Sequence, residues 1–325
     1  MKAIITAPFH RRGVEILSKY MDVTLSGWGQ TQKELTEDEL ISAAKGCEIL
    51  ITEVEDITAR VIDSCPDLKL IGCTRAVPRN VHVNAATEKG IPVFHAPGRN
   101  AQAVAELTVL LMIGVARKVF EAEHFVRDGE WTPDGEMPYL KFRGDEMCDK
   151  VVGIVGFGAI GRKVAAICNA IGCKIAAFDP FVTEAPDYVE LCTLDELMHR
   201  ADFVSIHCAV TDETRGMISK DLIAKMKPTA FFVNTARAAV VDENALIEAL
   251  SEHRIAGAGL DVFMDEPLPA DSPFFKLDNC VLLPHIGGAS HDVTRHHSII
   301  ISEAIADYLS GKGARCVANP QVIHG

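Results

Sequence analysis

The chain has 325 residues, a length that suggests about two domains. Its composition, with 48% hydrophobic and 24% charged residues, is that of a folded globular protein and excludes a disordered chain. The formal net charge of −13 argues against nucleic acid and anionic membranes as partners, because both would repel it. The 10 cysteines form no CxxC pair and are too sparse for a disulfide framework. They indicate reduced thiols, so we expect a cytoplasmic protein.

Neither a secretion signal nor a membrane span is expected. The apolar stretch near the N-terminus is shorter than the roughly 7–15 residues of a signal-peptide core. The most apolar segment, 107–116, is too short to cross a bilayer, which requires about 20 residues.

Short apolar runs alternate with helix-patterned runs over the first hundred residues. Strands are expected at 3–7, 23–26, 48–52, 70–74 and 92–95, and helices at 14–20, 36–45, 58–64 and 83–89. Thr36 and Glu39 have the spacing of a capping box, which predicts a helix start there. This alternation predicts a parallel sheet with helices on both faces.

A break at 96–100 precedes one long apolar helix, expected over 101–122 and buried against two surfaces, which could be two domains or a domain and a second subunit. The polar segment 128–150 is expected to be an irregular connection. A second alternation then begins, with strands expected at 151–155, 174–178, 203–207, 230–234, 256–260 and 281–283, and a last helix at 290–309. The predicted fold class is α/β, with two doubly wound parallel-sheet domains.

A GxGxxG motif formed by Gly156, Gly158 and Gly161 lies between a buried strand and a helix. The first glycine permits a tight turn, the second lets the backbone approach a pyrophosphate, and the third allows the helix to pack closely on the strand. The next strand ends at Asp179, where a carboxylate would bind the hydroxyls of an adenosine ribose. Asp179 also favours NAD over NADP, because a carboxylate repels a 2′-phosphate.

Three later segments, NTAR, DVFMDEP and PHIGG, each follow an expected strand. Because ligands bind at the carboxyl ends of strands in open α/β sheets, Arg237, Glu266 and His285 are expected to converge there. An Arg can hold a 2-oxo acid and polarise its carbonyl, a His can exchange a proton with the alkoxide, and a carboxylate can orient that His. The set predicts carbonyl–alcohol redox chemistry.

These motifs closely resemble those of the D-isomer-specific 2-hydroxyacid dehydrogenases, particularly the D-3-phosphoglycerate dehydrogenase-like members. The resemblance covers nearly the whole chain and is carried by GFGAIG at 156–161, HCAVTDETRGMI at 207–218, NTAR at 234–237, DVFMDEP at 261–267 and PHIGG at 284–288. It implies a flavodoxin-like substrate domain made of 1–99 and 292–325, a Rossmann NAD-binding domain over 100–291, and an active site in the cleft.

The resemblance also implies residue roles. Arg237 would bind the substrate and His285 would act as acid and base with Glu266 as its partner, while Asp261 would face the nicotinamide carboxamide. Cofactor contacts map onto Gly156, Phe157, Gly158, Ala159, Ile160, Gly161, Asp179, Cys208, Ala209, Thr214, Thr235, Ala236, Asp261 and Gly287. No metal site is expected. A homodimer or homotetramer is implied, with the helix region 101–122 in the interface.

The chain departs from the family pattern in its substrate loop. Phosphoglycerate-type members have Arg-Ala-Gly-Val-Gly, whereas this chain has RAVPRN, in which the candidate substrate-binding residues are Arg75, Ala76, Val77 and Arg79. Both glycines are absent, and the proline at 78 has no N–H with which to grip a carboxylate. One hypothesis is that Arg79 binds a second anionic group of the substrate; the alternative is that it is solvated on the loop surface. Elsewhere, Ala238 stands where the family usually has Gly, and Ala209 stands where it often has Pro.

The leading hypothesis is an NAD-dependent oxidoreductase that transfers a hydride between the nicotinamide and C2 of a D-2-hydroxy acid or its 2-oxo acid. Formate dehydrogenase relatives are disfavoured, because they have Gln at the position of Glu266. The alternative from another class is an NAD(H)-sensing, corepressor-like binding protein, since such proteins keep the Arg–Glu–His set. No regulatory domain follows the second alternation, so feedback by an amino acid is not expected. The substrate, the direction and the assembly stay open.

Overall fold

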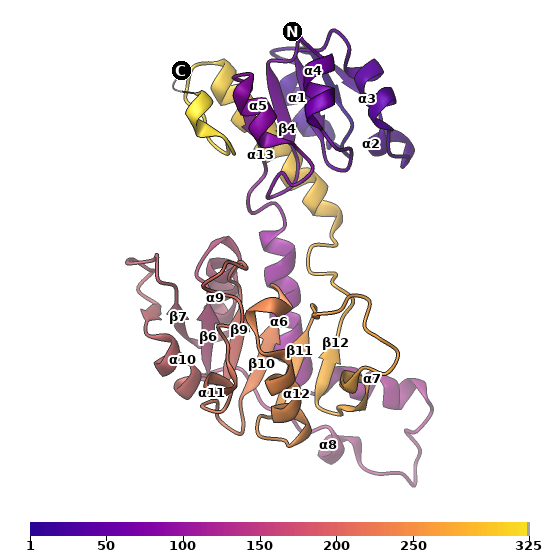
Figure 1. The fold of residues 1–325 in the computed structure, drawn as a ribbon. Helices are drawn as coiled ribbons and strands as arrows, with labels where there is room; N and C mark the ends of the chain where they lie inside the picture. Colours follow the sequence, from indigo (N-terminus) through magenta and orange to yellow (C-terminus); the bar gives the residue numbers. More distant parts are fainter. Residues whose placement is uncertain (324–325) are drawn as a thin grey trace. The chain divides into compact units, whose positions relative to one another are not determined.

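The computed structural model describes residues 1–323, which form two compact units. The first contains Met1–Asn100 together with the segment that begins at Ser290, and the second is Ala101–Ala289 (Figure 1). The first unit is therefore built from two separate stretches of the chain. The chain leaves it after Asn100 and returns to it at Ser290.

The first unit has a five-stranded, parallel sheet of order β2-β1-β3-β4-β5. Its strands are β1 (Lys2–Ile5), β2 (Asp22–Leu25), β3 (Ile49–Thr52), β4 (Leu70–Cys73) and β5 (Val93–Phe94). Strands β3 and β4 are buried at every position, so both appear in the sequence as continuous apolar runs rather than alternating ones. The order reverses between β1 and β3, as in flavodoxin-like sheets, which confirms the expected fold of this unit.

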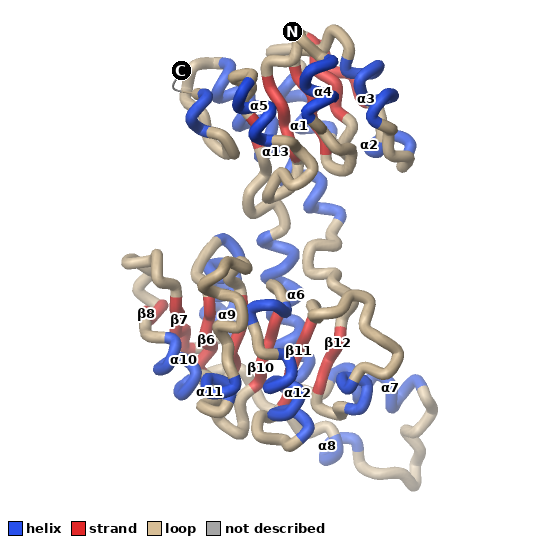
Figure 2. The backbone as a smooth tube through the Cα atoms, viewed as in Figure 1, coloured by secondary structure: helices blue, strands red, loops and turns tan. Residues whose placement is uncertain are grey.

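Helices cover both faces of this sheet (Figure 2). One face packs against α3 (Glu37–Ala44), α4 (Ala59–Ser64) and α5 (Val83–Glu88), and the other against α1 (Arg11–Leu17) and α13 (His291–Leu309). The capping box of Thr36 and Glu39 is present as predicted. The short helix α2 (Trp28–Thr31) was not expected from the sequence, and η3 (Pro320–Val322) follows α13.

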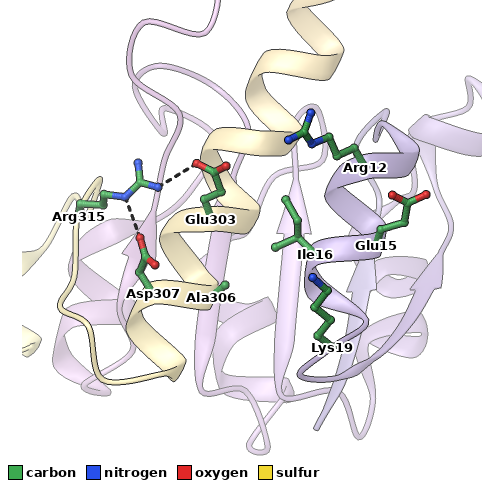
Figure 3. Close-up of a pocket in the computed structure, with 8 residues that line it drawn as sticks. All are labelled: Arg12, Glu15, Ile16, Lys19, Glu303, Ala306, Asp307 and Arg315. Atoms are coloured by element: carbon green, nitrogen blue, oxygen red, sulfur yellow. Dashed lines mark hydrogen bonds and ion pairs between the residues drawn. The ribbon is translucent and has the colours of Figure 1, made fainter.

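A groove runs between α1 and α13 on the surface of the first unit (Figure 3). It carries both signs of charge, since Arg315 pairs with Glu303 and Asp307 from α13, and Arg12 and Lys19 line it from α1. The C-terminal helix is bonded to the N-terminal segment by the N–H of His10, which donates to the hydroxyl of Ser298 at 2.9 Å.

The second unit has a seven-stranded, parallel sheet of order β12-β11-β10-β9-β6-β7-β8. Its strands are β6 (Val151–Val155), β7 (Lys174–Phe178), β8 (Val189–Leu191), β9 (Phe203–Ile206), β10 (Phe231–Asn234), β11 (Gly257–Leu260) and β12 (Cys280–Leu282). The order reverses at β6, as in Rossmann sheets, and confirms the expected fold. The edge strand β8 was not predicted, because it is short and only Val189 in it is buried.

Two helical layers enclose this sheet (Figure 2). The helices α6 (Ala101–Ala116) and α9 (Ala159–Ile171) pack on one face, and α10 (Leu194–Arg200), α11 (Lys220–Ile223) and α12 (Glu243–Ser251) on the other. The remaining elements are α7 (Val119–Arg127), α8 (Pro138–Lys141), η1 (Ala238–Val240) and η2 (Pro273–Lys276). No helix in the described part of the chain is long and apolar enough to cross a membrane.

The expected single helix over 101–122 is wrong. The chain breaks at Lys118, whose φ of 52° is left-handed and stops α6 before α7 begins at Val119. The carbonyl of Ala116 at the end of α6 accepts a hydrogen bond from the N–H of Asp145, at 3.0 Å, instead of continuing the helix. The apolar pattern of the sequence extends past Ala116, but the contact of α6 with the backbone at 144–145 ends the helix there.

Candidate functional site

The glycine-rich turn after β6 fits a dinucleotide pyrophosphate. Gly156 has a φ of 94°, and a Cβ there would lie 2.6 Å from the backbone nitrogen of Cys208. A Cβ on Gly161 would lie 2.2 Å from the carbonyl oxygen of Gly156, whereas one on Gly158 would meet nothing within 4 Å. The middle glycine thus faces open space, where a phosphate can approach the backbone. Helix α9 begins beside it with no side chain capping its first N–H groups, which leaves them available to an anion.

Asp179 follows β7 and ties this turn to the neighbouring strand. Its carboxylate accepts hydrogen bonds from the N–H of Phe157 at 2.8 Å and from the N–H of Phe181 at 3.0 Å. Each carboxylate oxygen has a further lone pair, so Asp179 can also accept hydrogen bonds from the hydroxyl groups of a ribose. The buried ring of Phe157 packs under the guanidinium of Arg162, 4.5 Å from the ring centroid.

The carboxyl ends of β10, β11 and β12 lie next to one another, and these strands carry the three chemistry-bearing segments. After β10, the buried side chain of Asn234 closes the NTAR turn. It donates to the carbonyl of Arg237 at 3.1 Å and accepts from the N–H of Ala236 at 3.0 Å. Thr235 is also buried, and its hydroxyl bonds that of Thr108 on α6 at 2.8 Å.

Arg237 is exposed, and one guanidinium nitrogen donates to the carbonyl of Ala236 at 2.5 Å. Its fork is otherwise available for a carboxylate. Ala238, which stands where the family usually has glycine, does not have a positive φ and begins η1. The turn therefore does not need glycine at this position.

His285 and Glu266 form the central contact of this region. The Nδ1 atom of His285 lies 2.7 Å from a carboxylate oxygen of Glu266, and the other oxygen accepts the N–H of Phe263 at 3.0 Å. Burial alone would raise the pKa of Glu266, but the bonds from His285 and Phe263 and the charges of His285 and Arg237 together lower it. The carboxylate of Glu266 therefore keeps its charge to a lower pH than an ordinary glutamate.

The loop after β12 holds the imidazole in a defined orientation. His285 has a φ of 55°, a left-handed conformation that is unusual for a residue with a side chain. The buried carboxylate of Asp261 keeps the loop in place by accepting the N–H groups of Ile286 at 2.8 Å and Gly287 at 2.7 Å. With Nδ1 engaged by Glu266, Nε2 of His285 has no hydrogen-bond partner among residues 1–323 and is available to a substrate.

The structure gives Asp261 a role that the sequence did not suggest. The resemblance implies that it faces a nicotinamide carboxamide, and in the structure its two oxygens accept loop N–H groups. Gly287 is required by this contact, because a Cβ there would lie 2.9 Å from a carboxylate oxygen of Asp261.

The other expected cofactor residues line turns near the glycine motif. Thr214 donates to the carbonyl of Ala209 at 2.6 Å and so closes the turn after β9, and burial raises the pKa of the Cys208 thiol, which stays protonated. Sequence reasoning missed His207, whose Nε2 bonds the hydroxyl of Ser205 at 2.8 Å. Burial lowers the pKa of His207 to about 3, so this ring is neutral.

The candidate substrate loop lies in the first unit. Nε of Arg75 donates to the carbonyl of Glu53 at 2.6 Å, and Nδ1 of His95 donates to the carbonyl of Ala76 at 2.7 Å. Val77 is 59% exposed. Arg79 is exposed, and within the described chain its side chain forms no hydrogen bond or ion pair.

The second unit therefore combines a dinucleotide-binding turn with a cation, an oriented imidazole and its carboxylate partner on neighbouring strands of one sheet. Such a set can bind a carboxylate, polarise a carbonyl and move a proton. No group of His, Cys, Asp and Glu side chains that could hold a metal ion is present in residues 1–323.

Comparisons with known proteins agree with this chemistry. Residues 109–287 match the family model described as D-isomer specific 2-hydroxyacid dehydrogenase, NAD binding domain. A Bacillus subtilis protein called "Putative 2-hydroxyacid dehydrogenase YoaD" is 38% identical over 96% of this chain and 92% of its own length. A D-3-phosphoglycerate dehydrogenase of Methanocaldococcus jannaschii is 36% identical over 98% of this chain, which spans 59% of that relative.

Among solved structures, the TT0316 protein of Thermus thermophilus is 34% identical over 98% of this chain and all of that one, with a TM-score of 0.78. Together with the family match, which spans more than half of the chain, these relatives show that the chain belongs to the D-isomer-specific 2-hydroxyacid dehydrogenases, a family of NAD-dependent oxidoreductases.

Proposed function

We propose that this protein transfers a hydride between NAD and C2 of a D-2-hydroxy acid or its 2-oxo acid, with Arg237, Glu266 and His285 as the catalytic residues. The observation that carries the proposal is the 2.7 Å contact between His285 and Glu266, because it leaves Nε2 of the imidazole free for proton transfer. The family membership supports the reaction class, and the geometry supports the assignment of residues.

In the reducing direction, the guanidinium of Arg237 binds the substrate carboxylate through a two-pronged contact and polarises the carbonyl. The bound nicotinamide supplies the hydride. Nε2 of His285 donates a proton to the oxygen at C2, and the carboxylate of Glu266 stabilises the imidazolium that precedes this step. In the oxidising direction the same nitrogen accepts the proton.

The cofactor contacts fall in the second unit. The open space at Gly158 and the uncapped start of α9 suit the pyrophosphate, and Asp179 suits the adenosine ribose. We assign the remaining contacts to residues of the glycine turn and of the segments after β9, β10, β11 and β12: Gly156, Phe157, Ala159, Ile160, Gly161, Cys208, Ala209, Thr214, Thr235, Ala236, Asp261 and Gly287. We assign Arg75, Ala76, Val77 and Arg79 of the first unit to substrate binding.

We also propose a cytoplasmic homodimer. The 10 cysteines are all free, which suits a reducing compartment. Large exposed apolar side chains gather between residues 110 and 140 of the second unit, as expected for a surface that another copy covers. They belong to α6, α7, α8 and the segment between α7 and α8: Leu110, Ile113, Val119, Val126, Trp131, Met137, Tyr139 and Leu140.

The direct test is oxidation of NADH in the presence of a panel of 2-oxo acids, including glyoxylate, hydroxypyruvate, phosphohydroxypyruvate and sugar-derived 2-oxo acids. We expect turnover of at least one of them. The His285→Asn variant should lower kcat by about 10²- to 10⁴-fold, the usual contribution of a general acid. His199→Asn is the matched control, because His199 is exposed on α10 of the same unit.

Two results would contradict the proposal. Binding of NADH without turnover of any panel member would favour the corepressor-like alternative, in which the same fold senses the cofactor. Turnover that survives His285→Asn undiminished would show that another group transfers the proton.

A further inference from the structure

Two buried cysteines lie near the end of α9, where the chain turns from this helix into β7 of the second unit (Figure 1). Cys168 belongs to the last turn of the helix, and Cys173 directly precedes the strand. Their side chains are 0% and 5% exposed and belong to one apolar cluster, together with Met112 and Met147. Neither cysteine has a part in the cofactor binding or the hydride transfer proposed above.

The way in which α9 ends brings these two residues together. Gly172 has a φ of 100° and ends the helix in the left-handed conformation, and its N–H donates to the carbonyl of Asn169 at 2.9 Å. The N–H of Cys173 donates to the carbonyl of Cys168 at 3.0 Å. These are the two bonds of a Schellman motif, in which the side chains of the first and last residues typically touch. The direct backbone bond also keeps the two Cα atoms within the span of a disulfide, roughly 4.4–6.8 Å.

The two thiols also interact with each other. A hydrogen bond between them lowers the pKa of Cys173 and, together with burial, raises the pKa of Cys168. The thiol of Cys173 donates to the carbonyl of Met147 at 3.3 Å, and the sulfur of Cys168 lies 3.9 Å from that of Met112. Cys173 is therefore the better nucleophile of the two, and Cys168 is the thiol beside it.

The segment 147–149 covers Cys173 on its outer side. Besides the bond from Cys173 to Met147, the N–H of Asp149 donates to the carbonyl of Gly172 at 3.0 Å. Cys148 and Asp149 are exposed, so the thiol of Cys173 lies directly beneath a stretch of surface. A small, uncharged oxidant such as hydrogen peroxide suits this depth. Cys148 is the rival partner, because its sulfur lies 2.9 Å from where a Cβ on Gly172 would be.

We propose that Cys168 and Cys173 form a reversible oxidation site, which reacts with hydrogen peroxide and closes a disulfide at the end of α9. The sulfur of Cys173 attacks one peroxide oxygen, the O–O bond breaks, and the leaving hydroxide takes the proton of this thiol to become water. The product at Cys173 is a sulfenic acid. The sulfur of Cys168 then attacks the sulfur of Cys173, the S–O bond breaks, and the second hydroxide leaves as water with the proton of Cys168.

The two thiols together lose two electrons, and the peroxide gains them. A thiol reductant such as dithiothreitol reverses the reaction by exchange. A single buried thiol would instead continue to sulfinic acid, which such reductants do not restore. The reaction uses neither NAD nor a 2-oxo acid, so it does not depend on the proposed function.

The test locates the disulfide by mass spectrometry. The folded, reduced protein is treated with hydrogen peroxide, the peroxide is removed, and the protein is then unfolded, alkylated and digested with trypsin. Cys168 and Cys173 fall together in the peptide 164–174, whereas Cys148 falls in 144–150. The peptide 164–174 should carry no alkyl group and be lighter than its reduced form by two hydrogen atoms. Dithiothreitol before alkylation should restore two alkylated cysteines.

Cys280 provides a matched comparison within the same protein. Burial raises the pKa of its thiol to about 12, and it is the single cysteine of the peptide 277–295. Its oxidation should lag behind that of the peptide 164–174 by at least about tenfold. Cys280→Ala and Cys148→Ser should leave the disulfide unchanged. Cys168→Ala should abolish it and leave Cys173 either alkylated or oxidised to sulfinic acid.

Three results would overturn the proposal. The first is a peptide 164–174 that carries two alkyl groups after peroxide treatment of the folded wild-type protein. The second is a cross-link between 164–174 and 144–150, which would make Cys148 the partner. The third is oxidation of Cys280 at the same rate as the pair, which would show that the arrangement of Cys168 and Cys173 confers no reactivity of its own.

Discussion

The imidazole of His285 is held both through its ring and through the backbone of the two residues that follow it. Its left-handed backbone costs of order 1 kcal/mol or more. Hydrogen bonds to charged groups contribute about 1.5–3 kcal/mol each, and this loop has three of them, one to Glu266 and two to Asp261. These bonds outweigh the strain, so the loop stays in a conformation that directs one ring nitrogen at Glu266 and leaves the other free.

The pH dependence of the reaction follows from the charge on Glu266. Because its pKa is lowered, the carboxylate keeps its charge throughout the neutral range and loses it only as the pH falls through that lowered value. In Glu266→Gln the charge is absent at every pH. We expect kcat/KM for reduction to be lower than in the wild type at neutral pH, and the acid-side fall that protonation of Glu266 causes in the wild type to be missing.

The measurement is the pH profile of NADH oxidation with the best 2-oxo acid. Glu243→Gln serves as control, because Glu243 caps the N–H of Met264 nearby without contacting His285. A kcat/KM of Glu266→Gln equal to that of the wild type at neutral pH would contradict the assigned role of the pair.

At the scale of elements, the order of the strands in the sheet decides which of the residues after the strand ends lie near one another. The segments after β10, β11 and β12 are neighbours because those three strands are consecutive in the parallel sheet. The same principle joins Asp179 after β7 to the glycine turn after β6, through the bond between its carboxylate and the N–H of Phe157. Strand boundaries in these places were predictable, since buried parallel strands are continuous apolar runs with clear ends.

The charge of Asp179 leads to a prediction about the choice between NADH and NADPH. In the wild-type protein, kcat/KM should be much higher with NADH than with NADPH, because the carboxylate repels a 2′-phosphate. Asp179→Asn keeps an oxygen that can accept the N–H of Phe157 and removes the charge, so the ratio should fall by about 10- to 100-fold. Asp187→Asn, an exposed change in the same unit, should leave it unaltered. Equal efficiencies with both cofactors in the wild type would refute the role of Asp179.

The helices were harder to predict than the strands. The run from 101 to 122 has the apolar pattern of one helix, yet it divides at Lys118 because the backbone near 145 takes the last carbonyl of α6. The short elements α2 and β8 have too few residues to show a periodicity. Such boundaries depend on contacts with distant segments, which a local pattern does not contain.

At the scale of the whole molecule, the exposed apolar side chains between residues 110 and 140 predict self-association. Light scattering should give the mass of two chains, or of four if dimers pair. Tyr139 and Leu140 are 76% and 58% exposed, so the double change to Asp places charges on this surface and should yield monomers without loss of helix signal. Phe181→Asp is the control, because Phe181 is 93% exposed outside this region. A monomeric wild-type protein would contradict the proposal.

The sequence by itself determined the α/β class, the parallel sheets, the glycine turn and the identity of the residues after the strands, because burial and turn geometry demand particular side chains locally. Only the tertiary structure decided which of those residues touch. The pairing of His285 with Glu266, the anchoring of the loop by Asp261, and the attachment of Arg75 and Arg99 to Glu53 join residues between 19 and 46 positions apart. Hydrogen bonds between such residues depend on the order of the strands and on the conformation of the loops, and no local segment of the sequence determines either of these.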